Sequence, residues 1–216
     1  MNPQALPPSR QKILEAATDV VRAKGYAATT VDDLCAAARV TKGSFFHHFK
    51  SKEEMVLQAV AHWNTWTDGV FAAAPYATAA DPRDRVFGYL DFRRDLLDHT
   101  VPQFTCLMGT LVQETYATHP DVRAACDRGM SSHVAVLTRD IEAARLQYAP
   151  DANWSAESVG YFIQAVLQGS FIFAKAKQDA EVARGNLAHL RRYLESLLGA
   201  PGDVRTPNSD RQEPGL

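Results

Sequence analysis

Residues 29–52 read TTVDDLCAAARVTKGSFFHHFKSK, and this stretch determines how the rest of the chain is interpreted. Thr30 precedes Asp33 by three residues, and Ser51 precedes Glu54 by the same distance. At this spacing a side chain can accept a hydrogen bond from the backbone at the start of a helix. Between the two starts there is room for two short helices and a tight connection, and such a pair presents its second helix outward.

The rest of the chain has the periodicity of helices. Apolar residues recur every three or four positions almost throughout, and no run of Val, Ile and Thr alternates between turn residues. The sequence therefore predicts an all-α protein of about nine helices. They are expected at residues 9–24, 30–38, 42–49, 51–74, 82–98, 103–117, 120–147, 155–178 and 182–198.

Glycine and proline mark several helix ends. Gly25 and Gly199 follow the last periodic residues of their helices, and Pro82 after an aspartate is typical of a first helical turn. Arg39 stands in the tight connection, where glycine is easier to accommodate. The helix that begins at Ser51 is expected to turn its apolar residues inward: Met55, Ala59, Val60, Trp63 and Trp66.

Composition excludes several classes of protein. The net charge of −2 argues against a protein that coats nucleic acid everywhere, because such a protein needs a broad basic surface. Residues 1–58 nevertheless hold eight Lys and Arg against six acidic residues, whereas the remainder holds 15 against 19. Cys35, Cys106 and Cys126 lack metal-ligand spacing, so neither a metal nor a cofactor is expected.

Location and catalysis follow from what the sequence lacks. It shows neither an apolar leader nor a run of about 18 apolar residues, so we expect no membrane association and a cytoplasmic protein. It has no nucleophile elbow, P-loop or HExxH pattern, and an enzyme would depend on unassigned histidines such as His62, His99 and His133. A helical protein–protein interaction module without DNA binding is the other alternative.

The segment resembles the N-terminal signature of the TetR/AcrR family, T-(T/S)-x-x-x-(I/L)-A-x-x-A-G-V-S-(K/R)-G-x-(L/F)-Y-x-H-F-x-(S/N)-K. The corresponding residues are Thr29, Thr30, Leu34, Cys35, Ala38, Arg39, Val40, Thr41, Lys42, Gly43, Phe45, Phe46, His48, Phe49, Ser51 and Lys52. The resemblance implies a transcriptional repressor that binds a palindromic operator in double-stranded DNA as a homodimer and is released by a small-molecule effector.

The resemblance also implies a division of the chain. Residues 1–8 would be a flexible N-terminus and residues 9–52 a helix-turn-helix DNA-binding domain. Residues 53–199 would bind the effector and dimerise. Residues 200–216 contain three prolines and no periodic apolar set, so disorder is expected there.

The residues expected to face DNA are Thr30, Thr41, Lys42, Gly43, Ser44, Phe46, His47, His48 and Lys52. The hydroxyls suit phosphates, Lys42 suits a phosphate or a guanine edge, and Lys52 lies where a helix dipole favours a phosphate. Phe45 and Phe49 are expected in the core. Phe46 replaces the family's tyrosine, so an apolar contact replaces a hydroxyl contact there.

An effector pocket is expected around Trp63, Trp66, Phe104, Cys106, Met108 and Phe162. The two tryptophans suit the core as well as a stacked ligand. Cys106 opens the helix expected at 103–117, where the helix dipole can increase the reactivity of a thiol, so it is a candidate for sensing as well as for lining. The neighbouring stretch also looks like C-terminal domains of family members that sense electrophiles or unsaturated acids.

The resemblance places the dimer interface on the last two helices. The residues expected there are Phe162, Val166, Gly169, Phe173, Leu190, Leu194 and Leu197. The helix from Ser51 to Trp66 is expected to act as a lever, because it is continuous from the DNA-binding end to the body.

Overall fold

The computed structural model describes residues 7–202, and in this range it is built from helices without a strand. The all-α prediction is confirmed. The elements are α1 (Pro8–Lys24), α2 (Val31–Ala38), α3 (Lys42–His48), α4 (Lys52–Ala72), η1 (Pro75–Thr78), α5 (Pro82–Asp95), η2 (Leu96–Asp98), α6 (Val101–Phe104), α7 (Leu107–Thr115), α8 (Pro120–Tyr148), α9 (Ala156–Lys177) and α10 (Glu181–Leu198).

The predicted helix starts in the N-terminal part are confirmed. The Thr30 side chain accepts a hydrogen bond from the Asp33 amide, and the Asp33 carboxylate accepts one from the Thr30 amide at 2.9 Å. The Ser51 side chain accepts from the Glu54 amide at 3.0 Å. Arg39 adopts the left-handed conformation with φ 55°, as a residue in place of a turn glycine must.

One predicted helix is broken in the structure. The helix expected at 103–117 consists instead of α6 and α7, which are separated at Thr105 and Cys106 by extended backbone. Thr100 and Gln103 form a capping box that starts α6 earlier than expected. Cys106 then begins α7, because its sulfur accepts a hydrogen bond from the Gly109 amide at 3.4 Å. The described range therefore has ten α-helices rather than nine.

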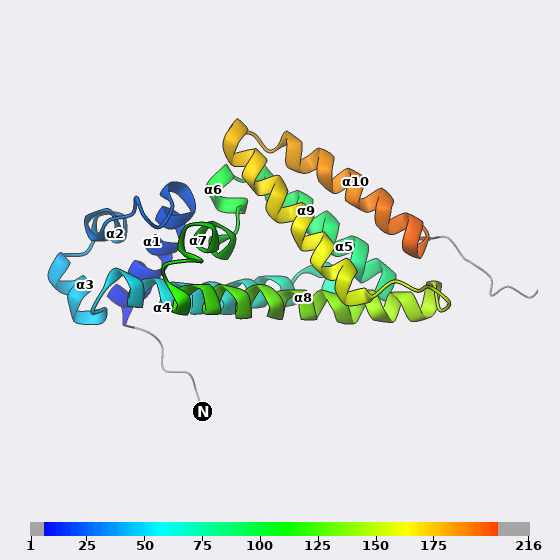
Figure 1. Ribbon diagram of the computed structural model, residues 1–216, viewed down its shortest axis with the longest axis horizontal. Helices are drawn as coiled ribbons and strands as arrows, with labels where there is room; N and C mark the ends of the chain where they lie inside the picture. Colours follow the sequence, from blue (N-terminus) through cyan, green and yellow to red (C-terminus); the bar gives the residue numbers. More distant parts are fainter. Residues whose placement is uncertain (1–6, 203–216) are drawn as a thin grey trace, which may run out of the picture.

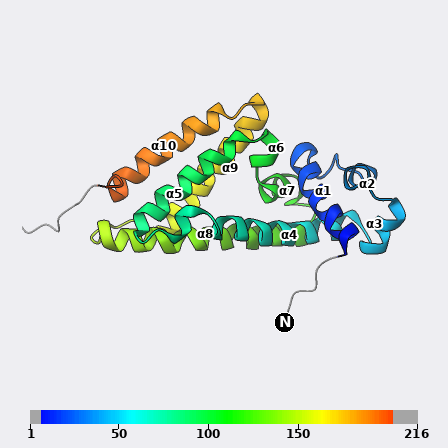
Figure 2. The same cartoon turned by 180° about the vertical axis from the view of Figure 1, so that it is seen from behind.

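Two hydrophobic clusters divide the molecule. The first, here called the head, joins α1–α3 to the first half of α4, to α7 and to the start of α8. The second, the body, joins α5 to α8, α9 and α10. Figures 1 and 2 both show α4 and α8 side by side along the long axis, with α3 at the tip of the head and α10 on the far side of the body. The half-buried Cys106 packs against both clusters.

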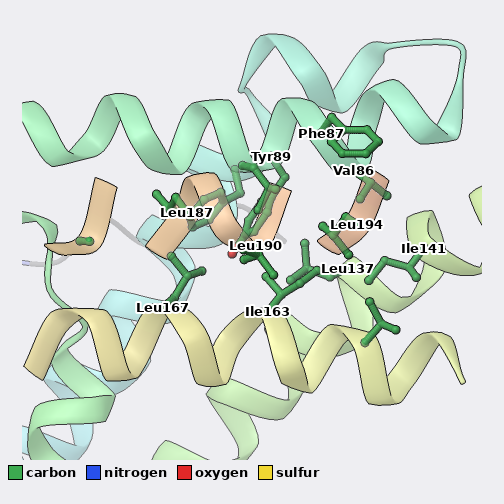
Figure 3. Packing of buried hydrophobic residues seen from close by; sticks show 14 of the residues in the cluster. Val86, Phe87, Tyr89, Leu137, Ile141, Ile163, Leu167, Leu187, Leu190 and Leu194 are labelled. Carbon is green, nitrogen blue, oxygen red and sulfur yellow. The ribbon is translucent and has the colours of Figure 1, made fainter. Parts of the chain in front are cut away.

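Two packing predictions are wrong. Trp66 is not turned inward, because 54% of it is exposed. Leu190 and Leu194 are not on an outer face, because they are 2% and 0% exposed and point toward α5 and α9 (Figure 3). The leucine stripe of α10 packs on α9 and α5 of the same chain. Leu197, at the end of the same helix, is half-buried against the body cluster.

The terminal predictions lie largely outside the described residues. The flexible segment expected at 1–8 is described only at its last two residues, where Pro8 already begins α1. Of the tail expected at 200–216, only 200–202 are described. No helix in residues 7–202 has the length and apolar character needed to cross a bilayer.

Candidate DNA-binding surface and internal cavity

The outer face of α3 is an exposed surface at the end of the head. Thr41 begins the helix by accepting a hydrogen bond from the Ser44 amide at 3.1 Å. Phe45, on the inner face, is fully buried and fixes the helix against α1 and α2, with which α3 packs. This leaves Phe46, 56% exposed, and His47 on the outer face. A large apolar side chain so exposed is typical of a contact surface.

Charge at this surface is concentrated at its edge. Lys42 lies in the first turn of α3 and pairs with Asp32 of α2 at 2.7 Å, although both side chains are more than 60% exposed. The hydrogen bond and charge of Asp32 raise the pKa of Lys42, so its ammonium stays protonated. Gly43 is exposed beside it, and the half-buried Ser44 completes the turn. An exposed ion pair of this kind costs little to exchange for a phosphate contact.

Two residues expected to face DNA are directed into the head, and the prediction is corrected for both. Lys52 donates hydrogen bonds to the carbonyl oxygens of Tyr26 and Thr29 at 3.0 and 2.9 Å, and its ammonium lies 4.2 Å from the centre of the Tyr26 ring. His48 is half-buried and bonds the Ser9 hydroxyl at 2.7 Å. Desolvation lowers the pKa of His48, so it is neutral at pH 7.

The hydroxyl of Thr30 is also engaged locally. It accepts from the Asp33 amide and donates to the Asp33 carboxylate at 2.8 Å. Thr30 therefore positions α2 first, and its contact with DNA stays a prediction.

A cavity of about 90 Å³ lies between the head and the body. Its walls come from α4, α5 and α6 to α9, and they include five of the six residues expected to form a pocket: Trp63, Trp66, Phe104, Cys106 and Met108. Phe162 is the exception. It is 44% exposed, because it lies about 100° around α9 from the buried Ile163, and it makes an edge-to-face contact with Tyr193 at 5.0 Å between ring centres.

Polar residues of the cavity form a network that the sequence analysis missed. The Tyr89 hydroxyl, on a residue 1% exposed, receives N–H donors from Arg93 and Gln164, each at 2.8 Å. His133 Nε2 lies 3.0 Å from the same oxygen. Burial, and secondarily the charge of Arg93, lowers the pKa of His133 to about 3, so its ring is neutral. Because the Tyr89 oxygen already accepts from Arg93 and Gln164, its O–H donates a hydrogen bond to His133 Nε2.

One signal in the sequence pointed to this network. Gln164 and Gln168 are four residues apart on α9, where they interrupt the apolar stripe formed by Ile163, Leu167 and Phe171. Polar residues at helical spacing beside a buried stripe indicate a polar cavity.

Charged side chains join the cavity walls to the head. Arg22 of α1 is 5% exposed, donates to the carbonyl oxygen of Gln103 at 2.6 Å and lies 4.7 Å from the Trp63 ring centre. Gln103 and Trp63 both line the cavity. Desolvation lowers the pKa of Arg22, although the nearby Asp19 opposes that shift.

A second connection runs through α7. Its Glu114 accepts hydrogen bonds from the backbone amides of Tyr26 and Ala27 at 3.1 and 2.8 Å, and so holds the loop between α1 and α2. Gly25 in that loop has φ 84°, and a Cβ there would collide with the Glu114 carboxylate. Since α7 begins at Cys106 on the cavity wall, one short helix links cavity and head.

Comparisons with known proteins agree with this geometry. Residues 13–59 match the model of bacterial regulatory proteins of the tetR family, and residues 82–184 match that of the LmrA/YxaF-like C-terminal domain of transcriptional regulators. The chain belongs to the TetR family. It is therefore a DNA-binding transcriptional regulator.

Relatives and solved structures match most of the chain. The repressor NemR of Escherichia coli is 23% identical over 202 residues, which cover 90% of this chain and 98% of that protein. AcuR of Cereibacter sphaeroides is 29% identical over 117 residues, 54% of this chain and 53% of AcuR. A TetR-family regulator from Agrobacterium tumefaciens superposes with a TM-score of 0.77 at 21% identity, covering 89% of this chain and 100% of that one.

The outer face of α9 and α10 is the remaining candidate surface of this TetR-family regulator. Phe173 and Tyr193 are 56% and 41% exposed, and together with Phe162 they border a groove. Val166 and Gly169 are half-buried at its floor, and a Cβ at Gly169 would meet nothing within 4 Å.

Proposed function

We propose that the repressor binds a palindromic operator as a homodimer and is released when a small molecule occupies the cavity. The observation that carries the proposal is the cavity itself, which lies between the operator-facing head and the body and shares Trp63, Gln103 and Cys106 with the elements that hold the head. No catalytic role is proposed, and the protein is placed in the cytoplasm, where its operator would be.

Dimerisation through α9 and α10 would bury the face around Phe162, Phe173 and Tyr193. Exposed aromatic side chains gathered on two adjacent helices are typical of an apolar interface. The open space over Gly169 would allow a partner helix to approach closely. In such a dimer the two α3 helices would lie about 34–36 Å apart, one turn of DNA, and read two half-sites.

Release would follow from differential binding of the ligand. A ligand stabilises the form of the protein that it binds more tightly, so a ligand that fits the cavity only when α4 or α7 is displaced would disfavour the operator-bound form. Linkage then requires that operator lowers ligand affinity by the same factor, with an expected coupling of about 1–3 kcal/mol.

Fluorescence anisotropy with the promoter DNA beside its own gene tests DNA binding. We expect salt-sensitive binding that is abolished by the double substitution Phe46→Ala, His47→Ala and retained by Arg139→Ala, an exposed cation of α8. Equal binding to unrelated DNA, or a double variant that binds as tightly as wild type, would contradict the assignment of α3.

Sedimentation tests the dimer. Tyr193→Asp places a charge on the proposed interface without entering the body cluster, so we expect a folded monomer that loses operator binding. Arg192→Asp, on an exposed residue next to it, is the matched control and should remain dimeric. A dimeric Tyr193→Asp protein with wild-type operator affinity would place the interface elsewhere.

A further inference from the structure

Among the described residues that line the cavity, Arg93 is the only Lys or Arg. Its guanidinium lies 4.4 Å from the centre of the Phe71 ring and 5.2 Å from that of Tyr89. It takes part in none of the ion pairs within residues 7–202, whereas its neighbour Arg94 pairs with Asp91 at 3.2 Å. The cavity therefore contains a positive charge with no carboxylate beside it.

Arg93 forms hydrogen bonds to neutral acceptors only, and these bonds do not use all the N–H donors of its guanidinium. Nε donates to the Tyr89 hydroxyl at 2.8 Å, and Nη2 lies 3.3 Å from Nε2 of the neutral His133. Nη1 has no hydrogen-bond partner in the part of the chain that the structure describes. Since the other two nitrogens are held by Tyr89 and His133, the guanidinium has a fixed orientation with donors left over.

The surroundings favour an anion over a cation. Within residues 7–202, Asp68 is the only acidic residue of the lining, and it is exposed. Gln164 and Gln168 add amide groups that can donate hydrogen bonds, and Phe71 and Phe104 supply apolar wall. A charge in such a site costs free energy unless an opposite charge joins it.

We propose that the ligand of this cavity is a small organic carboxylate, whose anionic group binds Arg93 and whose apolar part packs against the aromatic wall. A guanidinium held in one orientation can bind both carboxylate oxygens through paired N–H donors, a geometry that a neutral ligand cannot reproduce with equal strength. The proposal rests on the proposed function, because it names the ligand class of the same cavity.

The test compares acids with their neutral isosteres. Calorimetry is carried out on the free protein with butanoate and benzoate, and with butanamide and benzamide. We expect each acid to bind at least tenfold more tightly than its amide. The preference should vanish in Arg93→Gln, persist at lower affinity in Arg93→Lys, and be unchanged in the control Arg94→Gln, whose side chain is exposed. Equal binding of acid and amide, binding of neither, or a preference that survives in Arg93→Gln would overturn the proposal.

Operator binding of the same variants without ligand separates this inference from the proposed function. Arg93 lies in the body, so we expect Arg93→Gln and Arg93→Lys to bind operator as wild type does. A wild-type protein that binds no operator would contradict the proposed function. The acid preference is measured without DNA, so its result is independent of operator binding. If Arg93→Gln does not fold, the weakened but retained acid preference of Arg93→Lys decides the assignment.

Discussion

The head and the body build their sites over very different lengths of chain. In the head, Thr30 meets Asp33, Thr41 meets Ser44, and the residues that present α3 lie within one short segment. In the body, the cavity brings residues as far apart as Trp63 and Phe171 together. The proposed DNA-binding surface is thus determined locally, whereas the cavity depends on how six or more elements pack.

The hydrogen bonds that connect the head to the body, here called the joint, follow neither of these two patterns. Arg22 donates to the backbone carbonyl oxygen of Gln103, and Glu114 accepts from the backbone amides of the loop between α1 and α2. Hydrogen bonds to charged groups contribute about 1.5–3 kcal/mol each, more than neutral ones. Because these connections are stiff, a movement of the cavity wall can be transmitted to the head.

The largest expected effect contrasts an acid in the body with the same acid in the head. Leu194→Asp would bury an unpaired carboxylate in the body cluster, with an expected loss of more than about 4 kcal/mol of unfolding free energy and failure to fold. Phe46→Asp, on an exposed residue, should change that free energy by less than about 0.5 kcal/mol while abolishing operator binding. Circular dichroism during urea unfolding measures the unfolding free energy of both variants. A stable, soluble Leu194→Asp protein would show that α10 is not packed as described.

The joint should be the next most sensitive region. Arg22→Met removes the donor to the Gln103 carbonyl oxygen and the contact with Trp63, so we expect a loss of about 2–3 kcal/mol in urea unfolding. Lys24→Met, on the same helix as Arg22, removes a half-exposed ion pair with Asp33 of α2 and should cost less than about 1 kcal/mol. Equal costs for the two variants would argue against a special role for Arg22.

Acid should weaken the body before it weakens the caps of the head. The folded-state pKa of His133 is about 3 against 6.5 when unfolded, so its contribution to stability is present above pH 6.5 and is lost as pH falls toward 3. Between pH 7 and pH 5 this amounts to about 2 kcal/mol. For Asp33, hydrogen bonds from Lys24 and Thr30 lower the pKa to about 2, so its contribution is lost only below pH 3.8.

The variant His133→Gln isolates this effect. It keeps an acceptor for Tyr89 and should flatten the dependence of the urea midpoint on pH between 7 and 5. His48→Gln is the comparison in the head, where the pKa is lowered less, and should flatten it to a smaller extent. A His133→Gln protein with the pH profile of wild type would show that His133 is not the group that titrates.

The same contrast explains what the sequence could predict. The helix starts at Thr30 and Ser51 depend on residues three positions away, and the left-handed Arg39 depends on one turn, so all three follow from local rules. Whether Leu194 points into the core depends on which helix packs against α10. Periodicity alone cannot distinguish an apolar stripe that lies in the core from one that lies at a dimer interface. The spacing of Gln164 and Gln168 indicates a polar face on α9, but the contact between Arg93 and His133 joins residues 40 positions apart and does not follow from spacing.

The smallest expected effect separates two lysines that look equivalent in the sequence. Lys42 is exposed, and in the part of the chain that the structure describes its one ion pair is with an exposed aspartate, which a phosphate can replace. Lys42→Ala should then reduce the slope of log affinity against log salt by about 1 and leave the unfolding free energy nearly unchanged. Lys52 holds two backbone carbonyl groups of the head, so Lys52→Ala should instead lower the unfolding free energy by about 1–2 kcal/mol and leave the slope unchanged. Anisotropy titrations at several salt concentrations, together with urea unfolding, measure both quantities. A reduced slope in Lys52→Ala at unchanged stability would return that lysine to the DNA-binding surface and show that its inward geometry does not persist on the operator.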